Sequence, residues 1–149
     1  MRELPTRKNI RLKDYDYSQN GAYFVTMCIK NRHHILWDEE SIVGANRVRP
    51  KLSNIGNVVN YEINKINTVY ENVNIDKFVI MPNHIHMIIF VKNNDCYLAE
   101  SCGRTRFAPT ISRIIKQTKG LVTKQIGYSI WQKSFYDHII RNEEEYRQK

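Results

Sequence analysis

A predicted β-hairpin in the middle of the chain is the feature that most constrains the fold. Two apolar runs rich in β-branched and aromatic residues, 73–80 and 84–91, flank a short connection that contains Pro82 and Asn83. Proline and asparagine favour a bend, and runs of this length and composition favour strands. Because the connection is too short for a crossover, the pattern predicts two neighbouring antiparallel strands.

The second run begins with two histidines, His84 and His86, separated by one apolar residue. Side chains at positions i and i+2 of a strand leave from the same face, so we expect both imidazoles to point the same way. Ile85, Met87 and Ile89 should then face the core. Two imidazoles one strand step apart could bind a divalent metal ion. The alternative is a pair of polar residues on the exposed face of a half-buried strand, and the spacing alone does not decide between them.

The pattern along the rest of the chain predicts an α+β fold. Aromatic and β-branched residues predict a first strand and a fourth extended segment, and apolar residues at helical spacing predict two helices. The first strand is expected over 22–29, the helices over 53–70 and 110–125, and the fourth segment over 129–138. This β-α-β-β-α-β order is the ferredoxin-like arrangement, a four-stranded antiparallel sheet with two helices on one face. His84 and His86 are expected on the face that stays open.

The composition favours one basic domain over 1–149. Lysine and arginine outnumber aspartate and glutamate by 23 to 15 in 149 residues. This surplus favours a polyanionic partner, although it does not choose among DNA, RNA and a membrane surface. Three cysteines without CxxC spacing, with no evident signal peptide or apolar span, predict a soluble cytoplasmic protein.

Several basic residues are candidate DNA contacts. They are Arg7, Lys8, Arg11, Lys13 and Arg141. The N-terminal ones belong to a polar segment that is either a solvated tail or an arm lying on a nucleic-acid backbone. Two further basic stretches, 41–52 and 93–109, share a Gly-Arg-Pro spacing and are interpreted as loop insertions that are solvated or touch phosphate.

The last predicted helix carries a candidate nucleophile, Tyr146. Asn142 can cap this helix, and Glu145 sits at the capping-box position. The helix dipole at the first turn favours a phosphate and a developing phenolate. An ordinary, partly exposed helix tyrosine is the alternative interpretation, and Tyr136 is a competing nucleophile whose context favours strand packing. The helix stops at Lys149, so we expect that the sequence is truncated at its C-terminus.

Four stretches together resemble the single-tyrosine transposases of insertion sequences. They are Arg11-Leu12 with Tyr15-Asp16-Tyr17 and 21–26, then Val79-Ile80-Met81-Pro82-Asn83-His84-Ile85-His86, then 130–138, and Ile140-Arg141-Asn142 through Tyr146. They occur in order over nearly the whole chain. Within this His-hydrophobic-His superfamily, the chain is most similar to the REP-associated tyrosine transposases.

This resemblance implies a function and a site. Such proteins cut single-stranded DNA near a hairpin, form a covalent 5′-phosphotyrosine and rejoin strands. By position, His84 and His86 would bind Mg²⁺ or Mn²⁺, and Tyr146 would be the nucleophile. A third ligand would fall just past Lys149, so His138 is a candidate ligand or support. The family also implies a homodimer and, for a transposase, association with the bacterial nucleoid.

Two hypotheses from other classes remain. The chain could be a non-catalytic hairpin DNA-binding protein derived from such a transposase. It could also be an RNA-binding protein that stacks bases on sheet aromatics such as Tyr23 and Phe78. The histidine pair occupies the face where such stacking would occur, so the RNA hypothesis ranks last.

Overall fold

The computed structural model describes residues 21–39, 51–92 and 111–149. Along the chain the elements are β1 (Gly21–Cys28), η1 (Lys30–Arg32), α2 (Asn54–Val69), β2 (Val73–Ile80), β3 (His84–Val91), α3 (Ile111–Ile126), β4 (Tyr136–Ile140) and α4 (Glu143–Gln148). The predicted N-terminal arm and most of the two predicted basic loops lie outside the described residues.

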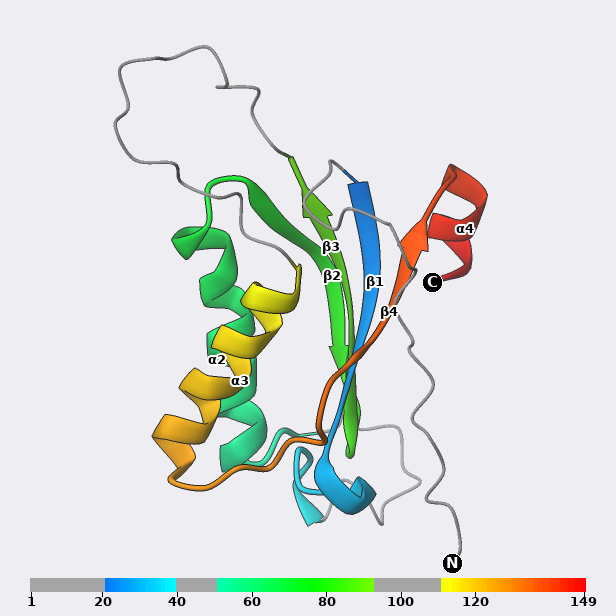
Figure 1. The fold of residues 1–149 in the computed structure, drawn as a ribbon. Coiled ribbons are helices and arrows are strands. Elements are labelled where there is room, and N and C mark those ends of the chain that lie inside the picture. The colour runs from blue at the N-terminus through cyan, green and yellow to red at the C-terminus, as the bar shows by residue number, and fades with distance from the viewer. Residues whose placement is uncertain (1–20, 40–50, 93–110) are drawn as a thin grey trace, which may run out of the picture.

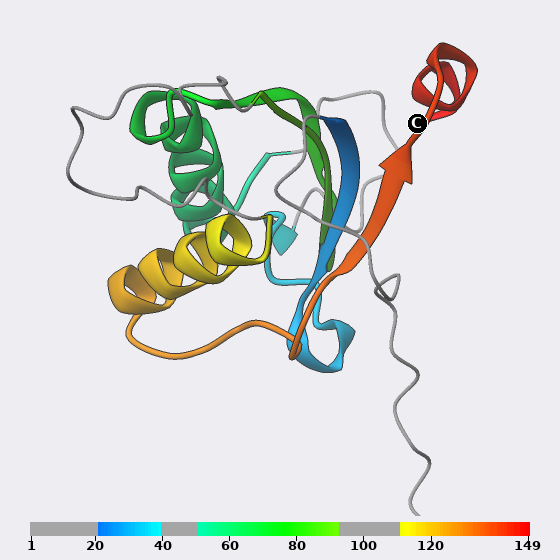
Figure 2. The same cartoon turned by 45° about the horizontal axis from the view of Figure 1, so that its top comes forward.

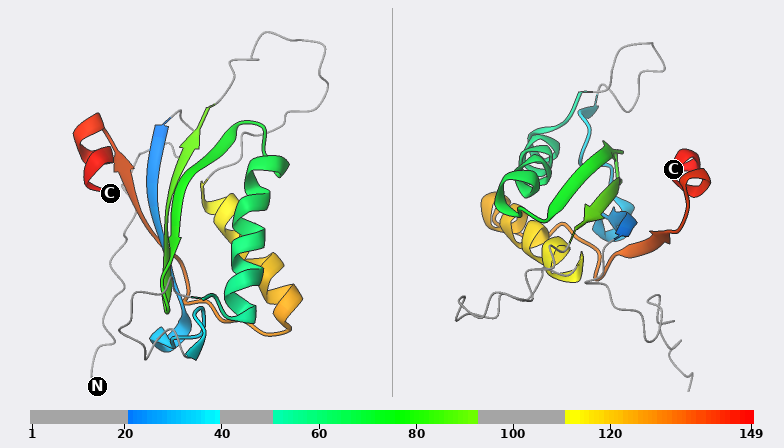
Figure 3. Two further views of the ribbon diagram at one scale, coloured as in Figure 1. Left: turned by 180° about the vertical axis from the view of Figure 1, so that it is seen from behind. Right: turned by 90° about the horizontal axis from the view of Figure 1, so that it is seen from above.

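The four strands form one antiparallel sheet in the order β2-β3-β1-β4. Helices α2 and α3 cover one face, and α4 lies on the other side of the sheet at the end of β4 (Figures 1 and 2). The view from above in Figure 3 shows this separation of α4 from the two long helices. The predicted ferredoxin-like fold with a C-terminal helix is confirmed.

Alternation along the central strands sends one set of side chains under the helices. In β1 the core residues are Tyr23, Val25 and Met27, and in β3 they are Ile85, Met87 and Ile89, all at most 1% exposed. Because successive strand residues point to opposite faces, the residues between them line the other side of the sheet. We call that side, opposite α2 and α3, the open face.

Helix α2 begins as the sequence predicts, at an N-cap serine. The Ser53 hydroxyl accepts a hydrogen bond from the Gly56 backbone N–H at 3.0 Å. The backbone N–H of Ser53 donates to the Leu36 carbonyl, and the Leu36 N–H donates to the Pro82 carbonyl, both at 3.0 Å. The start of α2 is therefore tied through Leu36 to the turn that precedes His84.

The fourth strand differs from its predicted extent. It begins at Tyr136 instead of 129, and it runs on to Ile140. The segment before it forms a single bridge, Trp131 with Ile29, and it is otherwise a loop. Aromatic content favoured a strand over the whole segment, but backbone pairing with β1 covers only its end.

Two aromatic residues do not serve the predicted RNA-stacking role. Tyr23 is 0% exposed beneath the helices, and Phe78 packs against the hydrophobic core. That prediction was wrong because the alternation of β1 places Tyr23 on the covered face. Phe24 and Phe90 take the open face instead.

Helix α4 is capped by Asn142, as predicted. The Asn142 side-chain oxygen accepts from the Glu145 N–H at 2.8 Å. Glu145 reaches back to the N–H of Arg141 at 2.8 Å, one residue before the cap, instead of to the cap residue itself. The reciprocal capping pattern therefore anchors α4 to the end of β4.

Candidate functional site

The histidine pair lies at the start of β3, on the open face. Strand register puts Thr26 of β1 directly opposite His86, and Cys28 opposite His84. Both imidazoles are partly exposed, and their ring centroids lie 4.7 Å apart in an edge-to-face arrangement. The predicted common direction of the two side chains agrees with this contact.

Each imidazole is oriented by a hydrogen bond at Nδ1. The Nδ1 of His84 lies 2.6 Å from the Asn83 side-chain oxygen, which can only accept, so His84 donates. The Nδ1 of His86 lies 2.9 Å from the Thr26 hydroxyl. His84 therefore carries hydrogen on Nδ1 and keeps its Nε2 lone pair, and His86 does the same when the Thr26 hydroxyl accepts. Neither Nε2 has a hydrogen-bond partner among the described residues. Such contacts fix the tautomer and ring orientation of metal-binding histidines.

An aromatic ring supports the pair from one side. Phe24 stacks on His86 with ring centroids 5.2 Å apart and planes inclined by 23°. The ammonium of Lys149 lies 5.0 Å from the centre of the Phe24 ring, so the end of α4 reaches the neighbourhood of His86.

The surroundings of both histidines lower their pKa values. Partial burial lowers the pKa of His84, and the nearby Arg32 charge lowers it further. Partial burial also lowers the pKa of His86, followed by the effects of His84 and Lys149. Both shifts favour the neutral imidazole, which is the form that binds a metal ion.

The pair fits a divalent metal ion in donor chemistry. Imidazole nitrogens are ordinary ligands for such ions, and the other positions can be filled by water or phosphate oxygens. In the described part of the chain, no three His, Cys, Asp or Glu side chains gather into a metal-binding cluster. The Nε2 of His138, the predicted third ligand or support, lies 3.8 Å from a Glu145 carboxylate oxygen.

Tyr146 lies over a different part of the open face. Its hydroxyl donates to the Asp76 carboxylate, its ring centroid is 6.1 Å from that of Phe90, and Lys77 Nζ is 5.2 Å from the ring. Phe90 is four residues beyond His86 on β3, which corresponds to about 13 Å between Cα atoms. Tyr146 is therefore held by Asp76, and it does not contact the histidine pair.

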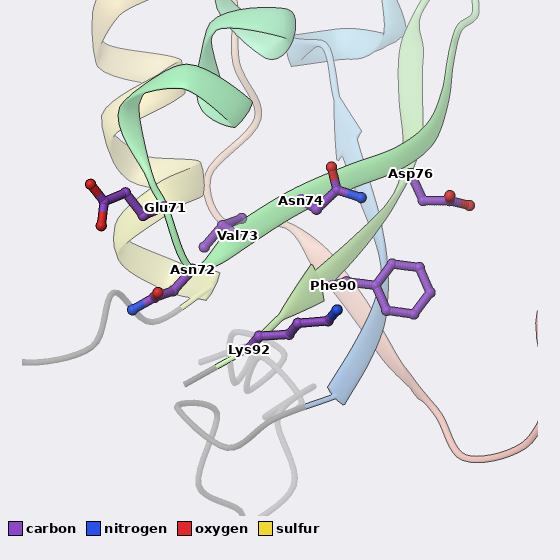
Figure 4. Close-up of a pocket in the computed structure, with 7 residues that line it drawn as sticks. All are labelled: Glu71, Asn72, Val73, Asn74, Asp76, Phe90 and Lys92. Carbon is purple, nitrogen blue, oxygen red and sulfur yellow. The ribbon is translucent and has the colours of Figure 1, made fainter. Parts of the chain in front are cut away.

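Asp76 owes its position to an irregularity in the sheet. The pairing of β2 with β3 shifts between Ile75 and Lys77, so Asp76 is the extra residue of a bulge. Figure 4 shows the Asp76 and Phe90 side chains directed to the same side of the sheet. They line a pocket of about 450 Å³ at this end of the strands.

Tyr136, the competing nucleophile, lies in line with the histidine pair. Register places it opposite Thr26 on β4, so His86, Thr26 and Tyr136 form one row across three strands. Opposed Cα atoms are about 5 Å apart, which puts His86 and Tyr136 at about 10 Å. Tyr136 is 51% exposed, so the predicted strand-packing role was wrong.

Of the predicted DNA contacts, one lies in the described part of the chain. Arg141 is exposed just before α4. The other four, Arg7, Lys8, Arg11 and Lys13, lie outside the described residues.

Sequence reasoning missed Thr26, Asn83 and Asp76 as partners of the site residues. Asn83 directly precedes His84, and its adjacency was a signal that could have been used. Thr26 and Asp76 depend on strand register and on a bulge, which no local pattern indicated.

We predict that Thr26→Val weakens Mn²⁺ binding by about 10- to 100-fold, because the orienting partner of His86 is removed. Titration calorimetry of the purified chain measures this change. Thr68→Val is the matched control, since Thr68 is exposed on α2 and its hydroxyl bonds only to the backbone of its own helix. Equal Mn²⁺ affinity of the Thr26 variant and wild type would show that the Thr26 contact does not orient a ligand.

Among the described residues, no helix has the length and apolar character needed to cross a membrane.

No known family model matches the chain. An uncharacterized protein of Haemophilus influenzae is 33% identical over 159 residues, an alignment that covers 95% of this chain and 83% of that protein. The structure of a REP-associated tyrosine transposase bound to a REP hairpin is similar, with a TM-score of 0.63 and 21% identity over 93% of this chain and 67% of that one. The chain therefore belongs to the same family as the Haemophilus influenzae protein and shares the fold of the transposase structure.

Proposed function

We propose that this protein nicks single-stranded DNA beside a hairpin and transfers the strand, using a metal ion bound by His84 and His86. The observation that carries the proposal is the pair of imidazoles on the open face, each oriented at Nδ1 by Asn83 or Thr26. A net charge of +8 supports a nucleic-acid substrate. The shared fold with a transposase solved on a hairpin supports the hairpin feature. A chromosomal substrate would place the protein in the bacterial cytoplasm.

The two histidines would hold Mg²⁺ or Mn²⁺ through their Nε2 atoms. A divalent ion there would polarise a phosphoryl oxygen and neutralise charge that develops during cleavage. The protein supplies the orientation, since Asn83 and Thr26 fix the rings before any ion binds. Phe24 packs on one side of His86 and limits access of water from that side.

A tyrosine oxygen would form a bond to phosphorus as the bond from phosphorus to the 3′-oxygen breaks. The phenol loses its proton, the departing 3′-oxygen gains one, and the strand is left as a 5′-phosphotyrosine. Attack by a 3′-hydroxyl reverses these bond changes, so rejoining needs no external energy source. Tyr146 remains our proposed nucleophile, and it must leave Asp76 to act. Tyr136 is the alternative because it shares a row with His86.

Formation of a denaturation-resistant protein–DNA adduct tests this proposal. With Mn²⁺ and hairpin-bearing single-stranded DNA, we expect an adduct that runs slowly on denaturing gels, is absent in EDTA and is abolished in Tyr146→Phe. Tyr61→Phe is the control, because Tyr61 is exposed on α2, which covers the face of the sheet opposite the histidine pair. An adduct that persists in Tyr146→Phe and disappears in Tyr136→Phe would transfer the nucleophile to Tyr136.

The same assay examines a homodimer in which one subunit's tyrosine serves the other's histidines. Mixing His84→Ala and Tyr146→Phe proteins would then restore the adduct on the His84→Ala chain only. Hairpin binding in EDTA without an adduct under any metal condition would favour the non-catalytic hairpin-binding alternative.

A further inference from the structure

A second surface feature, separate from the histidine pair, is a basic cavity of about 680 Å³ between η1 and the loop before β4. Lys30, Arg32 and Lys133 contribute cationic side chains to its lining, and no carboxylate among the described residues lines it. Trp131, also in the lining, is only 7% exposed. We call this feature the cationic cavity.

The two walls of the cationic cavity are fixed to each other by backbone hydrogen bonds. The Lys30 N–H donates to the Ile130 carbonyl at 2.8 Å, and the Gln132 N–H donates to the Cys28 carbonyl at 2.9 Å. Trp131 also pairs with Ile29 in an isolated bridge. The backbone segments that carry the charged side chains are therefore held together in the absence of a ligand.

Lys119 of α3 is hydrogen-bonded to the loop before β4, which forms the second wall of the cavity. Its ammonium donates to the carbonyls of Gln132 at 3.1 Å and Ser134 at 2.5 Å. The Trp131 indole N–H donates to the Lys119 carbonyl at 3.2 Å. Because Trp131 is buried and engaged in this way, it offers no exposed face on which a base could stack. The cationic cavity therefore offers charged and polar side chains but, among the described residues, no aromatic face for a base.

The cationic cavity adjoins the histidine pair. Its η1 wall begins two residues after Cys28, the last residue of β1, and Cys28 is opposite His84. The Ile29 N–H donates to the Asn83 carbonyl at 2.9 Å, beside the turn that orients His84.

We propose that the cationic cavity binds backbone phosphates of the unpaired DNA strand next to the phosphate at the histidine pair. A lining with three cationic side chains, and with no carboxylate among the described residues, matches a polyanion. The volume of the cavity exceeds what one phosphate needs, so a strand can lie along it. Such contacts fix the register of the strand without reading its sequence. This inference rests on the proposed DNA substrate, and it adds where the flanking strand lies.

The salt dependence of DNA binding tests the inference. In EDTA, which prevents metal-dependent cleavage, the affinity of the full chain for hairpin DNA with an unpaired tail is measured over a series of salt concentrations. Arg32→Gln with Lys133→Gln should lower the slope of log K against log salt by about 1.4, since each neutralised phosphate of a single strand accounts for about 0.7 of the slope. The matched control is Lys65→Gln with Lys124→Gln, two exposed lysines on α2 and α3. Its slope should change by less than that of the cavity variant.

Uncharged methylphosphonate linkages provide a second measurement that needs no substitution in the protein. Placed in the unpaired tail next to the hairpin, they should weaken wild-type binding and leave the cavity double variant nearly unaffected. Equal reductions in affinity for both proteins, or equal salt slopes for the cavity and control variants, would overturn the cavity assignment.

The inference and the proposed function can fail separately. If wild type forms the adduct but the cavity variant keeps the wild-type salt slope, the cavity assignment fails and the proposed function stands. If the slope changes as expected but no metal ion yields an adduct, the cavity assignment stands and the catalytic proposal fails.

Discussion

His84→Ala is expected to reduce Mn²⁺-dependent adduct formation by about 1,000-fold or more. Metal-ion catalysis contributes several kcal/mol to charge stabilisation in the transition state, and each 1.36 kcal/mol is a factor of ten in rate. One remaining imidazole cannot replace the pair of ligands, so binding of the metal ion should be lost together with activity. His86→Ala should behave in the same way, and the double variant should be no worse than either single one.

His34→Ala is the matched control for this effect. His34 is exposed in the segment after η1 and is not part of the row on the open face. Circular dichroism should show an unchanged fold for all of these variants, because His84 and His86 are only partly buried. Wild-type rates in both His84→Ala and His86→Ala would refute the metal-site proposal, whatever the fate of the tyrosine assignments.

Gly56→Ala should be strongly destabilising for a substitution that adds a single methyl group. A Cβ at this position would lie 2.1 Å from the Leu36 carbonyl oxygen and 3.2 Å from the Leu52 Cβ. The Leu36 carbonyl oxygen also accepts the hydrogen bond from the Ser53 N–H. Moving it away from the new methyl group would therefore strain this hydrogen bond. Overpacking of a well-filled site costs about 1–3 kcal/mol and occasionally more, and we expect about 3 kcal/mol here. For a chain of this size that corresponds to a fall in Tm of about 10 °C.

Gly120→Ala provides the opposite case on α3. No heavy atom lies within 4 Å of the Cβ that alanine would add there. Alanine restricts the unfolded chain and favours the helix, so the free energy of unfolding should rise by about 0.5–1 kcal/mol. Thermal melts of the two variants should therefore move in opposite directions. A Gly56 variant as stable as wild type would show that the α2–Leu36 contact is not close in solution.

The Gly56 contact also links stability to the site. Leu36 bonds to the Pro82 carbonyl, one residue before Asn83, so a displaced Leu36 would disturb the turn that orients His84. We expect the Gly56 variant to bind Mn²⁺ more weakly even at temperatures where it remains folded. Gly120 has no such connection, and its variant should bind Mn²⁺ as wild type does.

The sequence by itself determined the local features of this protein. Alternating apolar residues specified β3 and the shared face of His84 and His86, and the turn chemistry of Pro82 and Asn83 paired β2 with β3. Helices α2 and α3 begin and end within one residue of their predicted bounds. These features follow from the periods of strands and helices and from caps, which involve residues close in sequence.

Only the tertiary structure decided which distant groups meet. Strand register brings Thr26 to His86 and aligns Tyr136 with them, while a bulge presents Asp76 to Tyr146. The fourth strand is short because pairing with β1, and not its aromatic content, sets its length. Cross-strand partners depend on register and on the path of the whole chain, and a slip of one residue would reverse every side chain. The direction of the histidines was therefore a local property, whereas their partners are a property of the assembled sheet.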